Sequence, residues 1–122
     1  MTKELKDFED VQMWKGLKQL AKEIYEGFVS CNDYSFVDQI KRASVSSNVA
    51  EGAERGTSTE FARFLDIAKG SCGEVRSMLR LAGELDYLKE VDADKLAEDC
   101  IKISKQLGGF SKYLRNKSLA LK

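Results

Sequence analysis

The sequence predicts an all-α fold, an antiparallel up-down-up-down four-helix bundle formed by a single domain spanning residues 1–122. The chain contains no proline, the residue that most strongly interrupts helices. Four segments carry apolar residues at spacings of three and four, which place them on one face of a helix. Short stretches of turn and capping residues separate these segments, as in bundles whose sequence neighbours pack side by side.

The first helix is expected over residues 7–29. Its apolar face consists of Phe8, Val11, Trp14, Leu17, Ala21, Ile24, Tyr25 and Phe28. We interpret Trp14 as a core anchor rather than as a platform for a ligand. Gly27 weakens the end of this helix, and the polar run 31–34 is typical of a turn.

The second helix is expected over residues 35–53, with Ser35 as its N-cap. Its stripe narrows from bulky to small residues, namely Phe36, Ile40, Ala43, Ser47 and Ala50. Small side chains allow another helix to approach closely. This helix therefore offers a narrow face for packing within the bundle.

The third helix is expected over residues 58–87. Thr57 and Glu60 have the spacing of a capping box, and an apolar stripe runs from Phe61 to Leu85. Glycines at 70 and 73 interrupt this stripe, and each costs about 1 kcal/mol relative to alanine inside a helix. We hypothesise that close packing against the small face of the second helix offsets this cost.

The fourth helix is expected over residues 92–115, with Asp92 as its cap. A heptad-like seam suits near-parallel packing in a bundle and consists of Leu96, Cys100, Ile103, Leu107, Phe110 and Leu114. Gly108 and Gly109 interrupt the seam and predict a bend. Residues 116–122 are expected to fray.

The residue types present argue against an enzyme. The chain has no histidine, which removes Ser-His and Cys-His nucleophile pairs and the Glu-x-x-His metal sites of ferritin-like bundles. Cys31, Cys72 and Cys100 are odd in number and far apart, which argues against a disulfide framework and a zinc site. Cys72 and Cys100 lie on apolar stripes, where cysteine acts as a small hydrophobe. We therefore expect no catalytic residues, no cofactor and no metal.

The net charge is formally zero but is unevenly distributed. No acid follows Asp99, and six bases do: Lys102, Lys105, Lys112, Arg115, Lys117 and Lys122. The remainder has fourteen bases against twenty acids. This asymmetry indicates a basic surface for an acidic partner, with Lys102, Lys105, Lys112 and Arg115 as candidate contacts. The alternative is that these bases complement the dipole at a helix C-terminus.

A second polar group lies in the central stretch and consists of Arg42, Asn48, Glu51 and Arg55. Such residues in a bundle tie helix ends together or lie in a subunit interface, and we favour that role over ligand binding. No apolar run is long enough to span a membrane, and the charged N-terminus is unlike a secretory signal. We therefore expect a cytoplasmic protein.

Three linked blocks resemble a known family. They are FEDVQMWKGLKQLAKEIY, QIKRASVSSNVAEGAERG and EFARFLDIAKGSCGEVRSML. Together they are similar to the four-helix-bundle proteins encoded in intervening sequences of bacterial 23S ribosomal RNA genes, over roughly residues 8–88. A related branch includes the accessory variability protein of diversity-generating retroelements.

The resemblance implies an up-down bundle that assembles into a homo-oligomeric ring, a pentamer in relatives. It also suggests two functions. The first is a non-enzymatic interaction scaffold. The alternative is an RNA- or DNA-binding accessory protein that partners a reverse transcriptase, although that retroelement branch is strongly basic and this chain is neutral overall.

Overall fold

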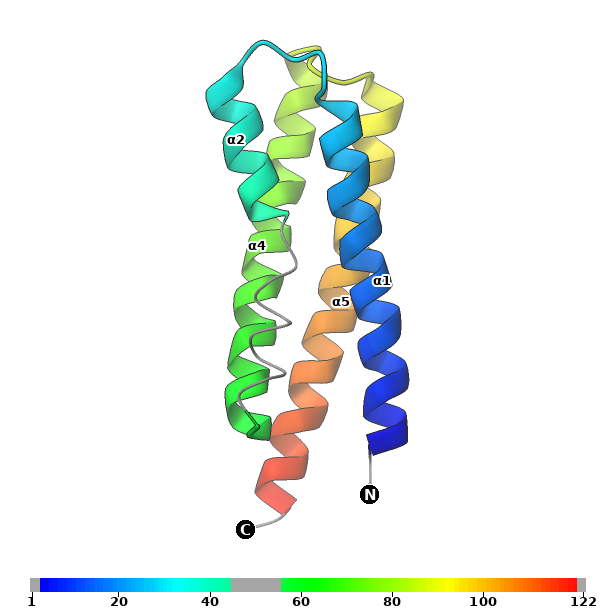
Figure 1. The fold of residues 1–122 in the computed structure, drawn as a ribbon, viewed down its shortest axis with the longest axis vertical. Coiled ribbons are helices and arrows are strands. Elements are labelled where there is room, and N and C mark those ends of the chain that lie inside the picture. The colour runs from blue at the N-terminus through cyan, green and yellow to red at the C-terminus, as the bar shows by residue number, and fades with distance from the viewer. Residues whose placement is uncertain (1–2, 45–55, 121–122) are drawn as a thin grey trace.

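This computed structural model describes residues 3–44 and 56–120, with the side chains of 12–44, 56–117 and 119. Within them lie four helices: α1 (Lys3–Gly27), α2 (Tyr34–Ala43), α4 (Ser58–Glu84) and α5 (Glu90–Ala120). The α1–α2 and α4–α5 turns lie at one end of the molecule, and the start of α1 and the end of α5 lie at the other (Figure 1). Because α1 and α4 each pack against α2 and α5, the helices close into a ring. The predicted all-α up-down bundle is confirmed.

The interior of the bundle is a single apolar cluster to which all four helices contribute side chains. The predicted seam of α5 is buried along its whole length. This seam packs against Phe61 of α4, whose ring lies edge-on to that of Phe110 with the ring centroids 5.4 Å apart. Burying a side chain of this size stabilises the fold by about 1.5–3 kcal/mol, so the seam contributes much of the stability of the bundle.

The start of α2 differs from the prediction. Asp33, rather than Ser35, is the N-cap, and its Oδ1 accepts a hydrogen bond from the backbone N–H of Phe36 at 3.1 Å. The other carboxylate oxygen, Oδ2, accepts a 2.7 Å hydrogen bond from the hydroxyl of Tyr87 in the α4–α5 turn. This contact between the two turns favours Asp33 as the cap, and Ser35 lies inside the helix.

The predicted cap at the start of α4 is confirmed, because the Thr57 hydroxyl accepts a hydrogen bond from the backbone N–H of Glu60 at 3.1 Å. The helix ends at Glu84 rather than at residue 87. The backbone N–H of Tyr87 then bonds to the carbonyl of Ala82 at 2.9 Å, and that of Asp86 bonds to Gly83 at 3.4 Å. This pair of bonds is a Schellman motif, and it reverses the chain toward α5.

The expectations for the last helix were wrong at both ends. The α5 helix begins at Glu90, two residues before Asp92, because the carbonyl of Lys89 accepts the backbone N–H of Asp92 at 3.0 Å and of Ala93 at 2.9 Å. It continues as a helix through Gly108 and Gly109 and ends at Ala120, so most of the segment 116–122 that was expected to fray is helical. The helix packs against both α4 and α1.

Some side chains expected in the core, and two glycines expected to pack closely, have other surroundings in the structure. Tyr25 and Leu85 are 49% and 47% exposed although both were assigned to apolar faces, and Trp14 packs against the core only in part. Apart from the adjacent residues and the nearby backbone of α4 itself, no described atom lies within 4 Å of the position that a Cβ would take at Gly70 or Gly73. The structure therefore gives no support to close packing at these glycines, and most of the small face expected on the second helix lies outside the described residues.

Candidate interaction surfaces

The two cysteines on the apolar stripes are buried thiols with no bonding partner. Burial raises the pKa of Cys72 to about 11 and, with smaller contributions from Cys72 and Asp99, that of Cys100 to about 12. Both thiols therefore stay protonated and act as small hydrophobes, as predicted. Among the residues that the structure describes, no group of three or more His, Cys, Asp and Glu side chains is placed to hold a metal ion.

Of the central polar group, only Arg42 lies within the described residues, and Asn48, Glu51 and Arg55 lie outside them. Arg42 is exposed and forms an ion pair with Asp38 one turn earlier on α2. Beside it, the side-chain amide of Gln39 donates a 3.3 Å hydrogen bond to Glu74 on α4. The Gln39–Glu74 hydrogen bond joins α2 to α4, whereas the Arg42–Asp38 ion pair lies within α2. The role of Arg42 in tying helices together or in a subunit interface therefore stays a prediction.

The four basic candidates on α5 do not form one patch. Successive residues of a helix are rotated by about 100°, which puts Lys105 and Lys112 on the same outward face, since they are seven residues apart. Lys102 instead lines a groove toward α1. Arg115 lies on the side of α5 that packs on α4, where it contacts Asp66. The proposed basic surface is therefore split between three sides of one helix.

Arg115 belongs to a polar cluster between α4 and α5. Its guanidinium lies 2.6 Å from an oxygen of Asp66 and donates a 2.7 Å hydrogen bond to the hydroxyl of Ser111. The Ser111 hydroxyl is buried and donates to Asp66 at 2.8 Å. The hydrogen bond from Arg115 holds the pKa of Asp66 below its usual value, so this pair stays charged across the neutral range. Arg115 thus joins two helices rather than facing a partner.

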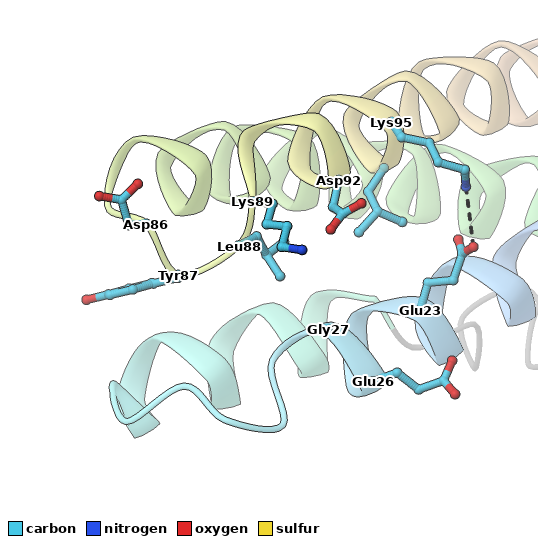
Figure 2. A pocket seen from close by; sticks show the side chains of 10 residues that line it. Glu23, Glu26, Gly27, Asp86, Tyr87, Leu88, Lys89, Asp92 and Lys95 are labelled. Carbon is cyan, nitrogen blue, oxygen red and sulfur yellow. Dashed lines mark hydrogen bonds and ion pairs between the residues drawn. The ribbon is translucent and has the colours of Figure 1, made fainter.

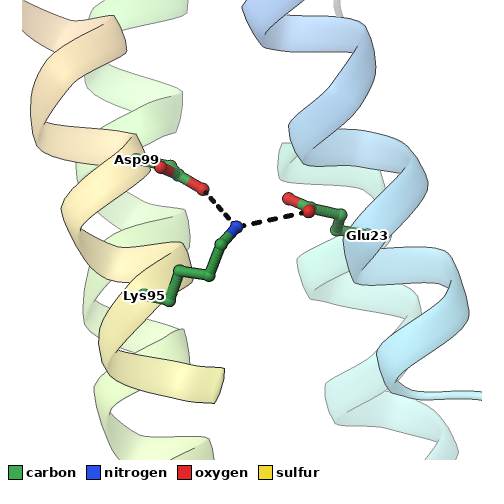
Figure 3. A network of polar contacts seen from close by, with 3 residues as sticks. All are labelled: Glu23, Lys95 and Asp99. Atoms are coloured by element: carbon green, nitrogen blue, oxygen red, sulfur yellow. Dashed lines mark hydrogen bonds and ion pairs between the residues drawn. The ribbon is translucent and has the colours of Figure 1, made fainter. Parts of the chain in front are cut away.

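A second polar cluster joins α1 to α5 and was not predicted from the sequence. Lys95 of α5 donates hydrogen bonds at 3.3 Å to Asp99 on the same helix and to Glu23 on α1 (Figure 3). The hydrogen bonds to Asp99 and then to Glu23 raise the pKa of Lys95. One ammonium group therefore compensates two carboxylates. Only the i, i+4 spacing of Lys95 and Asp99 is visible in the sequence.

Two hollows meet at this cluster. The first lies between the end of α1 and the α4–α5 turn, has a volume of about 610 Å³, and carries four acids and two lysines (Figure 2). The second is a groove of about 420 Å³ between the middle of α1 and α5. Glu23 and Lys95 line both hollows, so these run into one another along the α1–α5 seam.

The α4 helix carries exposed apolar side chains away from the core. Ile67 and Leu81 are each 44% exposed, and Leu85 is 47% exposed. Ile67 and Leu81 are fourteen residues apart and lie on the same face, about 20 Å from one another along the helix. Leu85 follows one turn after Leu81. This surface, which we call the α4 apolar face, consists of Ile67 and Leu81 of α4 and Leu85 directly after it. Glu74 lies on the same face, seven residues from both Ile67 and Leu81, and accepts the hydrogen bond from Gln39 of α2 there.

None of the described helices is long and apolar enough to cross a membrane. The sequence of the chain matches the model of one protein family over residues 9–109, and that family is described as 23S rRNA-intervening sequence protein. No curated protein sequence matches the chain. Because the match covers most of the chain and the structure is a four-helix bundle, the protein belongs to the 23S rRNA-intervening sequence protein family.

Proposed function

We propose that the protein is a non-enzymatic scaffold that works as a homo-oligomer. The observation that carries this proposal is the α4 apolar face, where three large apolar side chains, two on α4 and one directly after it, are 44–47% exposed. Leu81 and Leu85 are one turn apart, and neighbouring exposed apolar side chains are typical of surfaces that contact another protein. The resemblance noted in the sequence implies the same kind of assembly, a homo-oligomeric ring that is a pentamer in relatives.

A non-enzymatic role is consistent with the chemistry of the chain. It has no histidine, and burial keeps the Cys72 and Cys100 thiols protonated. Apart from Arg42, which pairs with Asp38 within α2, the charged side chains with shifted pKa values are engaged in contacts between helices or turns, such as Asp66 with Arg115. All three cysteines are free, as is usual in the cytoplasm, which is where we place this role.

Sedimentation of charge-inserting variants tests the assembly. We expect Ile67→Glu combined with Leu81→Glu to convert an oligomer into a monomer, because a buried carboxylate in the contact lacks a partner. The control is Val91→Glu, which puts the same charge on a side chain that is 72% exposed at the start of α5. Circular dichroism checks that all variants remain helical. An unchanged mass for the double variant would remove the α4 apolar face from the proposal.

The second candidate function is that of an RNA- or DNA-binding accessory protein, with a reverse transcriptase as its partner by resemblance. The observation that favours it is the stretch after Asp99, which contains six bases and no acid. Lys102, Lys105 and Lys112 are exposed there, and none forms an ion pair with another described residue. Fluorescence anisotropy with labelled RNA and DNA tests this role. Saturable binding that weakens as salt rises is expected, and no binding at low salt would exclude it.

A further inference from the structure

We propose that the groove between α1 and α5 binds the phosphodiester backbone of a nucleic acid strand. This inference rests on the second candidate function and names its site. The groove is lined by residues of both helices: Gln12, Lys15, Gly16, Gln19, Leu20 and Glu23 of α1, and Lys95, Asp99, Lys102, Ile103 and Gln106 of α5. It differs from the outward face of α5, where Lys105 and Lys112 project.

The balance of charge in the groove favours an anion. Its two acids, Glu23 and Asp99, both accept hydrogen bonds from Lys95 at 3.3 Å (Figure 3). Lys15 and Lys102 are exposed, and neither has an ion-pair partner within the described part of the chain. Two ammonium groups therefore remain free for a ligand, while the acids that would repel an anion are engaged.

The uncharged polar residues of the groove can add hydrogen bonds to phosphate oxygens. Gln12, Gln19 and Gln106 are exposed along its walls, and each carries an amide that donates two hydrogen bonds. Gln12 and Gln19 are two turns apart, about 10 Å along α1, with Lys15 between them. This row of donors can contact successive phosphates of one extended strand, which a single small anion would not need.

The shape of the groove explains why this site is preferred to the outward lysines. Gly16 keeps the floor open, because a Cβ there would lie 3.4 Å from Ile103 and 3.9 Å from the Gln106 side-chain oxygen. Leu20 and Ile103 are buried beneath it and form a low-dielectric wall. A concave surface of this kind concentrates the field of its charges, whereas Lys105 and Lys112 stand on a convex helix in open solvent.

The neighbouring hollow sets where the strand must end. Beyond Glu23 and Lys95, the α1–α5 seam continues into the hollow at the turns, whose lining includes Glu26, Asp86 and Asp92 together with Lys89 (Figure 2). Carboxylates repel phosphates, so a strand is confined to the half of the seam that contains Lys15 and Lys102.

The test compares two charge-matched variants by fluorescence anisotropy with labelled single-stranded RNA and DNA. Lys15→Gln with Lys102→Gln removes the groove lysines, and Lys105→Gln with Lys112→Gln removes the same charge from the outward face. We expect the groove variant to lose about tenfold or more in affinity at moderate salt. The slope of log K against log salt should also fall by about 1.4, since each phosphate contact to a single strand contributes about 0.7. The outward variant should bind nearly as the wild type does.

Two further variants separate the groove from a general effect of charge. Glu23→Gln with Asp99→Asn frees Lys95 and should tighten binding several-fold. Gly16→Leu fills the floor without changing charge and should weaken binding, with thermal melting used to confirm that it folds. Loss of affinity mainly in the outward variant, or equal loss in both, would overturn the groove and leave the second candidate function standing. No binding by the wild type would overturn both, and equal competition by polyglutamate would overturn the phosphate assignment.

Discussion

Asp86 has a backbone conformation that its side chain does not favour. It is a non-glycine residue with a positive φ of 59°, at the position after α4 where Schellman motifs usually carry glycine. Its own backbone N–H and that of Tyr87 close the motif through Gly83 and Ala82. The two hydrogen bonds of the motif form only when Asp86 adopts this positive φ. They therefore offset the cost of placing a residue other than glycine there.

We expect Asp86→Gly to raise the free energy of unfolding by about 0.5–1 kcal/mol, since relief of the left-handed strain exceeds the extra entropy of glycine in the unfolded chain. Asp86→Ala is the matched control, because it removes the carboxylate and keeps the Cβ. Urea denaturation measures both. Equal gains in the two variants would show that the charge of Asp86, and not its backbone, is unfavourable.

The Tyr87–Asp33 hydrogen bond joins the two turns at one end of the bundle and makes stability depend on pH. The hydrogen bond from Tyr87, followed by that from the Phe36 N–H, lowers the pKa of Asp33. The same bond to Asp33 is the main reason that the pKa of Tyr87 is raised. The contribution is therefore complete above about pH 4 and below about pH 10, the unfolded values. It is lost as pH falls through the lowered Asp33 pKa or rises through the raised Tyr87 pKa.

Tyr87→Phe should accordingly lower the free energy of unfolding, measured by urea denaturation, by a constant amount near neutral pH. The loss should be smaller at strongly acidic and strongly alkaline pH. The ring remains to pack on Phe36, whose centroid lies 5.2 Å away, so only the hydroxyl is tested. Tyr113→Phe is the control, because the buried Tyr113 hydroxyl has no hydrogen-bond partner among the described residues. A pH-independent difference between wild type and Tyr87→Phe would contradict this assignment.

Contacts between residues far apart in sequence limited what could be predicted for the candidate site. Arg115 is among the basic candidates because it lies in the acid-free stretch after Asp99. In the structure it pairs with Asp66 on another helix. Likewise, Ser35 and Asp33 are both capping residue types, and the hydroxyl of Tyr87 favours Asp33. Neither pairing has a short-range signal in the sequence, because each depends on how helices and turns meet in the bundle.

At the scale of helices, the spacing of apolar residues predicted the buried faces well, whereas the predicted helix ends were less accurate. The whole seam predicted for α5 is buried, because a repeat of three and four specifies a face whatever the neighbouring helix is. The helix is not interrupted at Gly108 and Gly109, although glycine has a low helix propensity. Lys69 of α4 lies across Gly108, with its Nζ 3.2 Å from where a Cβ would be, so packing overrides the low helix propensity of glycine.

Glycines within the helices should respond differently to alanine according to their neighbours. Gly16→Ala should stabilise the protein by about 0.5–1 kcal/mol, because its Cβ would make an ordinary 3.4 Å contact with Ile103. Gly83→Ala should destabilise it, because that Cβ would lie 3.1 Å from the Cβ of Ala93, which is fixed to the backbone of α5. Thermal and urea unfolding of the two variants give the comparison. Stabilisation by Gly83→Ala would show that α4 and α5 can separate at this turn.

For the molecule as a whole, four helices close a ring around one core and leave two kinds of surface outside it. The α4 apolar face suits a second copy of the chain, and the groove between α1 and α5 suits an anionic strand. The two surfaces lie on different helices, so the proposed assembly through α4 would leave the groove open. A scaffold of this kind can repeat one binding groove around an oligomer, which raises affinity for a long strand through multivalency.

The molar mass of the wild-type protein, measured by sedimentation equilibrium at micromolar concentrations, tests the central claim most directly. We expect a discrete species whose mass is a multiple of 13.7 kDa, with five copies implied by the family resemblance. A single 13.7 kDa species throughout the concentration range would contradict the oligomeric scaffold.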